Sequence, residues 1–345
     1  NFTRLVSDAL SRLHGGAKVL LTTSCTAALE LSALLLDLHP NDEVIVPSFT
    51  FVSSANAFAL MGATIVFADI NEQTLTIDED CLASLVTDRT RAIVAVNYGG
   101  YPAVTATMRR FCQSRSITIV EDNAHGLFGP DGSLPLGTQS SLSTLSFHET
   151  KNISCGEGGA LVINDPSHID RAEIIREKGT NRSKFFRGAV DKYTWVDLGS
   201  SYLMSDIAAA ILLSQVEHAE TIQRRRATLA ELYDASLAAW MEANGVQAPV
   251  CNTRAGSPHH LYCALFPDLT TRTRFMKHMK DHGVAVAFHY IPLDTSPGGR
   301  RFGRAPLGCE ISQDISDRLV RLPLFSDMRD DEHRNVIEAA LKFRS

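Results

Sequence analysis

The alternation of short apolar runs with helical stretches over residues 18–165 constrains the fold of this chain more than any other feature. The β-rich runs lie at 19–22, 43–47, 63–70, 91–98, 117–123, 141–148 and 159–164. Strands that alternate with helices predict a mostly parallel sheet. Several runs, such as IVFADI and AIVAVNY, are continuously apolar, which is typical of central strands that helices cover on both faces. The sequence therefore predicts an α/β fold built on a large sheet.

The rest of the chain predicts a bridging helix and a second, smaller α/β unit. A long helical stretch over 205–226 continues through LAELYDASLAAWMEA with one charged and one apolar face. The stretch 296–306 is rich in Gly, Pro and Arg and is interpreted as a surface loop. We place a large domain at 1–220 and a small C-terminal domain, which includes the bridging helix, at 221–345. Within the small domain the pattern predicts a strand at 259–266, a helix at 271–282, a strand at 284–291 and helices near 312–320 and 331–343.

Composition and charge favour an enzyme that acts on small molecules. The 345 residues carry a formal net charge of −6 with no basic block, so neither nucleic acid nor an anionic membrane surface is predicted as a partner. The longest apolar run falls short of the ~20 residues that a membrane span requires. Seven cysteines lie scattered without a CxxC pair or a metal-ligand spacing, which predicts reduced thiols and no metal site. With no signal-peptide pattern at the start, we expect a cytoplasmic location.

The first candidate site is the turn Ser24-Cys25-Thr26, between an apolar strand and a nearly all-apolar helix. Free backbone N–H groups at the start of that helix, together with two hydroxyls, would hold a phosphate group, and the helix dipole would add ~0.3–2 kcal/mol. An ordinary Ser/Thr N-cap is the alternative interpretation of the same residues.

The second candidate is the pair Glu121-Asp122, which ends the run ITIVEDN. Open α/β sheets bind ligands beyond the carboxyl ends of their strands, so we expect an acid here to face the crevice. Asp122 would keep a heteroaromatic nitrogen protonated, which pyridoxal phosphate needs if its ring is to act as an electron sink. A helix-capping Asp is the alternative. His125 would reach the same ligand or have a structural role.

The third candidate is Lys151, which follows a predicted strand and precedes a Gly-rich turn in SFHETKNISCGEGG. Burial would disfavour the charged ammonium and lower the pKa of this lysine, as a Schiff-base lysine requires near neutral pH. Taken alone, a solvated surface lysine is the alternative, and neighbouring Ser146 and His148 are weaker candidates. A phosphate-type turn, a strand-end acid and a lysine, in that order, together match one cofactor, pyridoxal 5'-phosphate, and the aspartate-aminotransferase fold.

The sequence resembles the DegT family of sugar-nucleotide aminotransferases over its whole length, through TSCTAAL, DEVIVPSFTFVSSANA, VEDNAHG, SFHETKNISCGEGG, GSSYLMSDIAAA and FHYIPL. The resemblance implies the aspartate-aminotransferase fold, with a large, mostly parallel sheet domain and a smaller C-terminal α/β domain. It also implies a homodimer with shared active sites, and transfer of an amino group from L-glutamate to the 4-keto carbon of a nucleotide-linked 4-keto-6-deoxy sugar. Segments such as SFHETKN and DLGSSYLMSD look most like the members that convert dTDP-4-oxo-6-deoxy-D-glucose into dTDP-4-amino-4,6-dideoxy-D-galactose for cell-surface polysaccharide.

The resemblance also implies roles for individual residues around the cofactor ring. Lys151 would form the Schiff base, and Asp122 would pair with the pyridine nitrogen. Phe51 would stack on the ring, and His125 would lie near the ring oxygen.

Other residues are implied at the phosphate of the cofactor. Cys25 and Thr26 would bind it through backbone and hydroxyl groups, and Ser146 would add a hydroxyl. Ser201 aligns with an asparagine that is usual in the family and would reach the phosphate across a dimer interface.

Two departures from the family pattern and several alternatives stay open. Ser201 and Leu203 replace the common asparagine and basic residue, and Asp294 stands where a PLH motif has histidine. On the same fold, a sugar 3-dehydratase, a 3-keto transaminase or a gluco-forming transaminase is possible, although dehydratases carry histidine in place of Lys151. A non-catalytic regulatory protein is a further alternative. A nicotinamide dehydrogenase is disfavoured because no GxGxxG follows an early strand.

Overall fold

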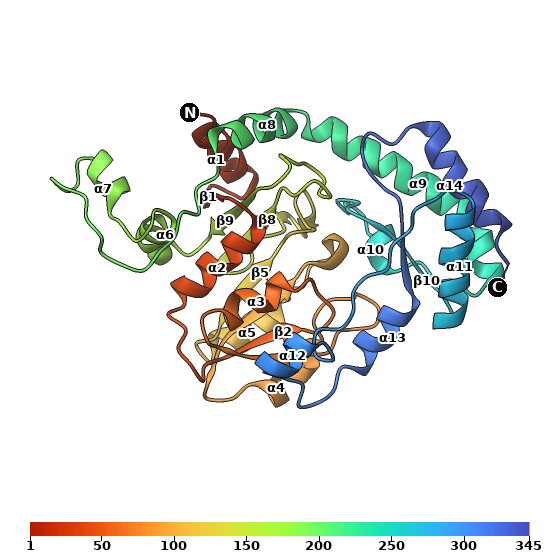
Figure 1. Ribbon diagram of the computed structural model, residues 1–345, viewed down its shortest axis with the longest axis horizontal. Coiled ribbons are helices and arrows are strands. Elements are labelled where there is room, and N and C mark those ends of the chain that lie inside the picture. The colour runs from red at the N-terminus through yellow and green to blue at the C-terminus, as the bar shows by residue number, and fades with distance from the viewer. Residues whose placement is uncertain (345) are drawn as a thin grey trace.

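The predicted alternation builds an eight-stranded sheet in the computed structural model, which describes residues 1–344 (Figure 1). In order across the sheet, the strands are β1 (Lys18–Thr22), β9 (Gly159–Ile163), β8 (Leu142–Ser146), β5 (Thr118–Asp122), β4 (Thr90–Val96), β2 (Glu43–Pro47), β3 (Thr64–Ala68) and β11 (Gly303–Arg304). Of these eight strands, β9 alone runs in the direction opposite to the other seven. Each of the seven predicted runs contains one strand, so the prediction of a mostly parallel sheet is confirmed.

Helices cover both faces of the sheet because successive side chains of a strand point to opposite sides. On the buried strand β2, Val44 and Val46 pack in a core formed with α2 and α3, whereas Ile45 packs on the other face with α4 and α5. Helices α1 and α8 pack at the β1 end. The helices of this part are α1 (Phe2–Leu13), α2 (Cys25–Leu35), α3 (Ser53–Ala59), α4 (Leu82–Leu85), α5 (Ala106–Gln113), α6 (Ile169–Arg176), α7 (Arg182–Phe186) and α8 (Asp206–Glu217).

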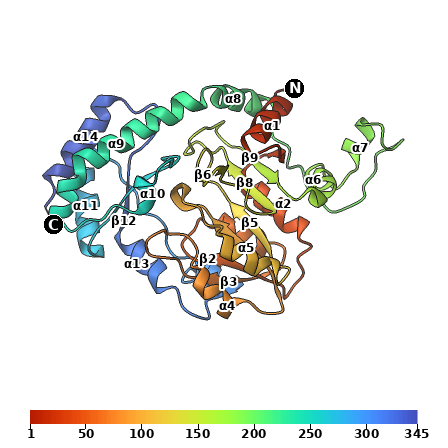
Figure 2. The ribbon, with the colours of Figure 1, turned by 180° about the vertical axis from the view of Figure 1, so that it is seen from behind.

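The C-terminal part forms a separate core around the long helix α9 (Ala219–Ala243). Apolar residues from α9 to the end of the chain, among them Tyr233, Trp240 and Phe275, make up one buried cluster. Figures 1 and 2 show α8 and α9 following one another along one side of the molecule, from α1 to α14. The remaining elements are α10 (Val250–Thr253), β10 (Tyr262–Leu265), α11 (Leu269–Asp281), α12 (Pro297–Phe302), α13 (Glu310–Arg318), β12 (Leu319–Leu322) and α14 (Asp330–Lys342), with a small hairpin of β6 (Pro130–Asp131) and β7 (Leu134–Pro135) elsewhere.

Four sequence-based expectations about the C-terminal part were wrong in detail. The long helical stretch is two helices that meet at His218, whose φ of −100° and ψ of 9° interrupt the helix. The strand expected at 284–291 does not form. Only Ala287 pairs with β12, through a single bridge to Arg321, and the chain then turns away so that His289 and Tyr290 pack in the core. The helix expected near 312–320 ends at Arg318, where β12 follows and pairs with β10.

The fourth correction concerns the expected surface loop at 296–306, which contains α12 and strand β11 of the large sheet. Ser296 begins α12 by accepting a hydrogen bond from Gly299 N, with Pro297 in the first turn. Gly303 pairs with Ile65 so closely that a Cβ would lie 2.6 Å from the Ile65 carbonyl oxygen. A segment beyond residue 220 therefore completes the large sheet, and the division of the chain at that residue stays a prediction.

Two further contacts fasten the C-terminal part to the sheet. Asp69, just after β3, accepts hydrogen bonds from the backbone N–H groups of Ile311 and Ser312 at 2.9 and 2.8 Å, and so caps α13. Asp294 accepts a hydrogen bond from Ser48 Oγ at 2.5 Å, next to the end of β2. In the described chain, no helix combines the length and hydropathy of a membrane span.

Candidate active site

A large cavity of about 1270 Å³ lies beyond the carboxyl ends of the strands, where open α/β sheets bind ligands. One wall consists of the segments that follow β1, β2, β5 and β8. The opposite wall comes from the C-terminal part and includes His260, His289, Tyr290 and Arg321. Seven of the eight predicted site residues line this cavity, namely Cys25, Thr26, Phe51, Asp122, His125, Ser146 and Lys151. The topology thus gathers side chains that lie far apart in sequence.

The turn before α2 offers free backbone donors to the cavity. Ser24 caps α2, since its side chain accepts a hydrogen bond from Ala27 N at 3.0 Å. The N–H groups of Cys25 and Thr26 have no acceptor among the residues that the structure describes. The turn packs directly on β9, where a Cβ on Gly159 would lie 2.3 Å from a backbone atom of Ser24. The N-cap and the anion site are therefore compatible at this turn, because the Ser24 cap leaves two N–H donors for an anion.

Asp122, the last residue of β5, presents a buried and firmly held carboxylate to the cavity. Its Oδ2 accepts from Ser54 Oγ at 2.7 Å and its Oδ1 accepts from Ala124 N at 3.1 Å. Glu121 points to the other face of the sheet, where it accepts from Asn97, Gly137 and Ser140. Burial raises the pKa of Glu121. Only one acid of the pair faces the crevice, because neighbouring residues of a strand alternate between faces.

Lys151 is mostly buried and lies within the electrostatic reach of Asp122. Burial lowers its pKa from the ordinary value of 10.5, and this effect outweighs the opposing influence of Cys25 and Asp122. The loop is anchored by the next residue, Asn152, whose Nδ2 donates to Pro258 O at 2.6 Å and whose Oδ1 accepts from His260 Nδ1 at 2.9 Å. The amine is therefore an accessible nucleophile and base at moderate pH.

Three neutral histidines form much of the cavity wall near Lys151. His125 stacks on His260 with ring centres 4.2 Å apart, and its Nδ1 accepts from Gly99 N at 3.3 Å, which leaves the proton on Nε2. Burial lowers the pKa of His125 and His260 well below 6.5, and the charge of Lys151 adds to the effect. Burial, with the charge of Arg321, lowers the pKa of His289 to about 2. His125 is thus a hydrogen-bond donor rather than a cation.

Of the remaining predicted residues, Phe51 and Ser146 lie in the cavity and Ser201 does not. Phe51 is 57% exposed, with its ring centre 6.4 Å from that of Tyr290. Its free ring face is available for stacking. Ser201 lies on an exposed segment that bridges to Glu177, outside the cavity of its own chain.

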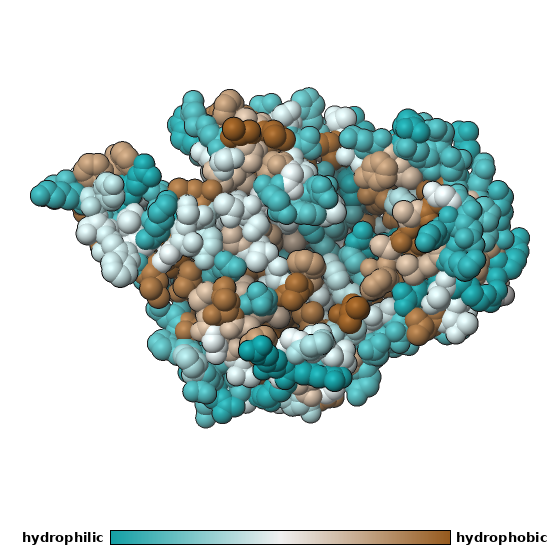
Figure 3. Space-filling view, viewed as in Figure 1, coloured by the Kyte–Doolittle hydropathy of each residue, from teal (hydrophilic) through white to brown (hydrophobic). Residues whose placement is uncertain are grey.

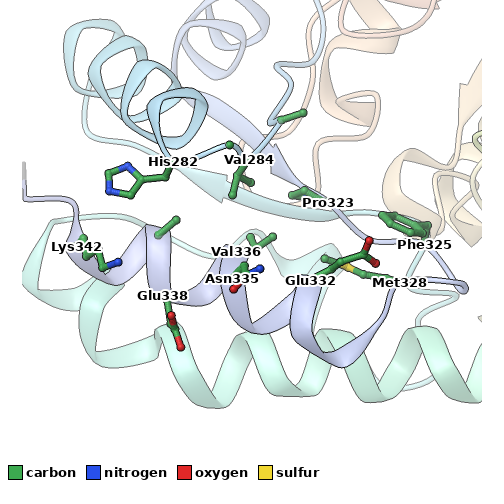
Figure 4. Close-up of a pocket in the computed structure, with 13 residues that line it drawn as sticks. His282, Val284, Pro323, Phe325, Met328, Glu332, Asn335, Val336, Glu338 and Lys342 are labelled. Atoms are coloured by element: carbon green, nitrogen blue, oxygen red, sulfur yellow. The ribbon is translucent and has the colours of Figure 1, made fainter.

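Sequence reasoning assigned no role to four residues of the C-terminal wall: His260, His289, Tyr290 and Arg321. Two of them lie in FHYIPL, which carried the family resemblance, so that motif held the signal. A second pocket of about 730 Å³, between α14 and residues 282–285, has a mixed lining of apolar side chains and the polar residues His282, Glu332, Asn335, Glu338 and Lys342 (Figure 4). It contains none of the predicted site residues. No cluster of three or more metal-ligating side chains occurs in residues 1–344.

The sequence from residue 2 to residue 341 matches the profile of the DegT/DnrJ/EryC1/StrS aminotransferase family. The chain belongs to this family. It is similar to the spore coat polysaccharide biosynthesis protein SpsC of Bacillus subtilis, with 30% identity over 94% of this chain and 85% of SpsC.

Solved structures of aminotransferases share the fold. The aminotransferase TlmJ from Streptoalloteichus hindustanus is 28% identical, with a TM-score of 0.88 over 98% of this chain and 89% of that one. Spr1654 from Streptococcus pneumoniae, assigned as a sugar aminotransferase, is 26% identical with a TM-score of 0.87 over 99% and 91% of the two chains. The predicted aminotransferase fold, with a large mostly parallel sheet and a smaller domain, is therefore confirmed.

Spr1654 was solved in PMP and PLP forms, and the cavity of this chain fits such a group. The Cys25 and Thr26 N–H groups suit a phosphate, and the buried Asp122 suits a protonated ring nitrogen. Lys151 supplies the amine. The donor set thus matches each polar part of pyridoxal 5'-phosphate.

The lowered pKa of Lys151 predicts an unusual labelling profile in protein freed of cofactor. As pH rises, acylation of Lys151 should reach half its maximum below pH 10.5, because burial lowers the pKa of its amine and the neutral form appears at lower pH. Mass spectrometry of peptides after brief acylation measures the profile, with the exposed Lys277 as the internal control. Coincident profiles for the two lysines would contradict the proposed environment.

Proposed function

We propose that this protein is a cytoplasmic, pyridoxal-phosphate-dependent enzyme that transfers an amino group from L-glutamate to the 4-keto carbon of a nucleotide-linked 4-keto-6-deoxy sugar. The supporting observation is the buried amine of Lys151 in one cavity with the carboxylate of Asp122 and the free N–H groups before α2. Family membership and the sugar-related relatives support the substrate class.

The proposed mechanism assigns one task to each group. Bound pyridoxal phosphate supplies an electron sink that stabilises the carbanion at the reacting carbon. Asp122, fixed by Ser54 and the N–H of Ala124, keeps the ring nitrogen protonated. His125, with its proton on Nε2, would donate a hydrogen bond to the ring oxygen. The N–H groups of Cys25 and Thr26 hold the phosphate.

Lys151 moves the protons in both half-reactions. Its neutral amine would accept the proton from the α-carbon of glutamate. The amino group would stay with the bound cofactor, water would supply the keto oxygen, and 2-oxoglutarate would leave. When the keto sugar enters, the same amine delivers a proton to sugar C4, which becomes the aminated carbon. The two substrates use one cavity in turn, so ping-pong kinetics follow.

Replacement of Asp122 tests the electron-sink assignment. Asp122→Asn should leave the fold intact and lower kcat by ~100-fold or more, because a neutral amide cannot stabilise a protonated pyridine nitrogen. The matched control is Glu121→Gln, since Glu121 lies on the same strand but faces away from the cavity. Near-normal turnover of Asp122→Asn would show that another group serves the ring nitrogen.

We further propose that each active site uses two chains. Ser201 lies outside its own cavity, on the segment that leads into α8, as expected if it completes the phosphate site of a second copy. Figure 3 shows apolar groups near α1 and α8 and over the face that carries α2 and α3, a distribution suited to subunit contact. The exposed apolar residues of these elements include Phe2, Leu5, Ile207 and Ile211, and Leu60 follows directly after α3.

Charge on α8 tests the proposed dimer. Ile207 is 79% exposed and Ile211 is 51% exposed, and both should become buried in the dimer. The double variant Ile207→Asp, Ile211→Asp should therefore be a monomer by light scattering, with at most a few per cent of wild-type turnover. Leu269→Asp, on a residue of α11 that is 46% exposed, should keep the dimer. A fully active wild-type monomer would contradict the shared site.

The finer proposal is that dTDP-4-oxo-6-deoxy-D-glucose is the substrate and that the product has the galacto configuration. The segment around α7 projects from the molecule in Figures 1 and 2. Its sequence from residue 178 to residue 192 contains five lysines and arginines. Two of them are paired, Lys184 with Asp170 and Arg187 with Glu173, whereas Lys178, Arg182 and Lys192 form no ion pair with the described residues. None of the five lines its own cavity, so we place the free cations at the diphosphate in a second copy.

Incubation with glutamate and a panel of 4-keto nucleotide sugars tests the substrate. Turnover should be fastest with dTDP-4-oxo-6-deoxy-D-glucose, and NMR of the product should show an axial amine at C4. Reactions without glutamate serve as the control. An equatorial amine would reassign the protein to the gluco-forming transaminases, and no turnover of any dTDP sugar would refute the proposed substrate.

A further inference from the structure

His260, two residues before β10, is a cavity residue whose tautomer is fixed by its neighbours. Asn152 follows Lys151 directly in the chain, and its Nδ2 donates to Pro258 O at 2.6 Å. A carbonyl oxygen can only accept, so this bond sets the orientation of the Asn152 amide and makes Oδ1 the acceptor for His260 Nδ1, at 2.9 Å. His260 therefore carries its proton on Nδ1 and has a lone pair on Nε2.

The other two histidines of this wall have no lone pair to offer. His125 accepts from a backbone N–H through Nδ1, which leaves its proton on Nε2. His289 Nε2 accepts from Arg321, so its proton is on Nδ1, which donates to Tyr98 Oη at 3.2 Å. Among these three neutral imidazoles, only His260 keeps an acceptor that no group in residues 1–344 uses.

The unused nitrogen of His260 faces the cavity. Nε2 has no partner in the described part of the chain, yet it is not sealed from solvent, in contrast to Nε2 of His333. The ring stacks on His125 with centres 4.2 Å apart and planes at 30°. The carbonyl oxygen of His260 accepts from Arg226 Nη2 at 2.6 Å. Ring and backbone are both held, so the Nε2 acceptor is preorganised.

The amine of Lys151 is the nearby donor that lacks an acceptor. Its Nζ makes no hydrogen bond and no ion pair within residues 1–344. The charges that act on it are those of Cys25, Asp122 and Arg321. Both oxygens of Asp122 already accept hydrogen bonds, and we assign this carboxylate to the ring nitrogen. Once Lys151 has taken a proton, it is a buried ammonium, which is unfavourable without an acceptor.

His260 suits this ammonium because it stays neutral. Burial, together with the charges of His125 and Lys151, lowers the pKa of His260 well below 6.5. The influence of Lys151 on this pKa also shows that the two side chains lie within electrostatic reach. A neutral imidazole accepts a hydrogen bond without taking the proton itself.

We propose that His260 is a positioning residue for Lys151, whose ammonium donates a hydrogen bond to His260 Nε2. This inference rests on the proposed aminotransferase function for its effect on turnover, whereas the contact itself can be measured in protein without cofactor. The bond limits the directions in which the proton-carrying amine points, and this orientation favours proton transfer at the reacting carbon. Because the same ring holds Asn152, one imidazole positions both the lysine loop and the amine.

Two substitutions separate the acceptor from the anchor. His260→Asn places its amide near the position of Nδ1, so it keeps a donor for Asn152 and lacks the Nε2 acceptor. His260→Gln places its amide near Nε2, so it keeps an acceptor for Lys151 and loses the anchor. In cofactor-free protein, loss of the acceptor disfavours the ammonium, so His260→Asn should lower the pH of half-maximal Lys151 acylation by about 1 pH unit. His260→Gln should stay within about 0.3 pH unit of the wild type.

The rate of the first half-reaction gives a second readout. In single-turnover reactions of the pyridoxal-phosphate holoenzyme with glutamate, His260→Asn should lower the maximal rate about 10-fold, because proton transfer loses its support. The KM for glutamate should change less than about 2-fold. His260→Gln should recover most of the wild-type rate.

His282→Asn is the matched control, because His282 is exposed and lies outside the active-site cavity. It should have the acylation profile and the rate of the wild type. If wild-type holoenzyme fails to react with glutamate, the proposed function is wrong, and the acylation profiles still test the contact.

Three outcomes would overturn the inference about His260. The first is a wild-type acylation profile for His260→Asn. The second is a shift confined to His260→Gln, which would make His260 only an anchor of the loop. The third is an equal shift in both variants, since the acceptor would then not be its cause. Should His260→Asn not fold, the His260→Gln profile decides: an unchanged profile supports the inference and a shift to lower pH overturns it.

Discussion

Burial of the central sheet on both faces is the constraint on which the rest of the structure depends. Val44 and Ile45 enter different cores on opposite sides of β2, so helices must cover both faces and the connections must cross from one end of the sheet to the other. This arrangement brings the carboxyl ends of the parallel strands to one edge. Cys25, Asp122 and Lys151 lie far apart in the sequence, and the crossover connections place all three around one cavity.

Burial also determines the chemical character of the site. The same loss of solvent that lowers the pKa of Lys151 keeps His125 and His289 neutral, so the wall around the amine donates and accepts hydrogen bonds without adding charge. The two oxygens of the Asp122 side chain accept hydrogen bonds from Ser54 Oγ and the N–H of Ala124, which fix its orientation toward the cavity. The mechanism thus depends on environment as much as on residue type, as the contrast with the protonation-prone Glu121 on the opposite face shows.

The strands and one wall of the cavity were predictable because their signals are local. An apolar run of β-branched residues identifies a strand, and the residue that follows it identifies the carboxyl end. The C-terminal wall was not predictable in this way. His260, His289 and Arg321 reach the cavity only through packing of distant segments, and strand β11 forms because Gly303 permits a close approach to Ile65. Such contacts have no periodic signature in the sequence. Ser201 is a third case, since its proposed role requires a second chain.

Covalent trapping tests the central claim most directly. Protein incubated with pyridoxal 5'-phosphate would be reduced with borohydride, digested and mapped by mass spectrometry, so that the lysine bound to the cofactor carries a pyridoxyl group. The structure predicts stoichiometric modification of Lys151, with exposed lysines such as Lys277 unmodified. Modification of another lysine in place of Lys151, or no modification at all, would contradict the account.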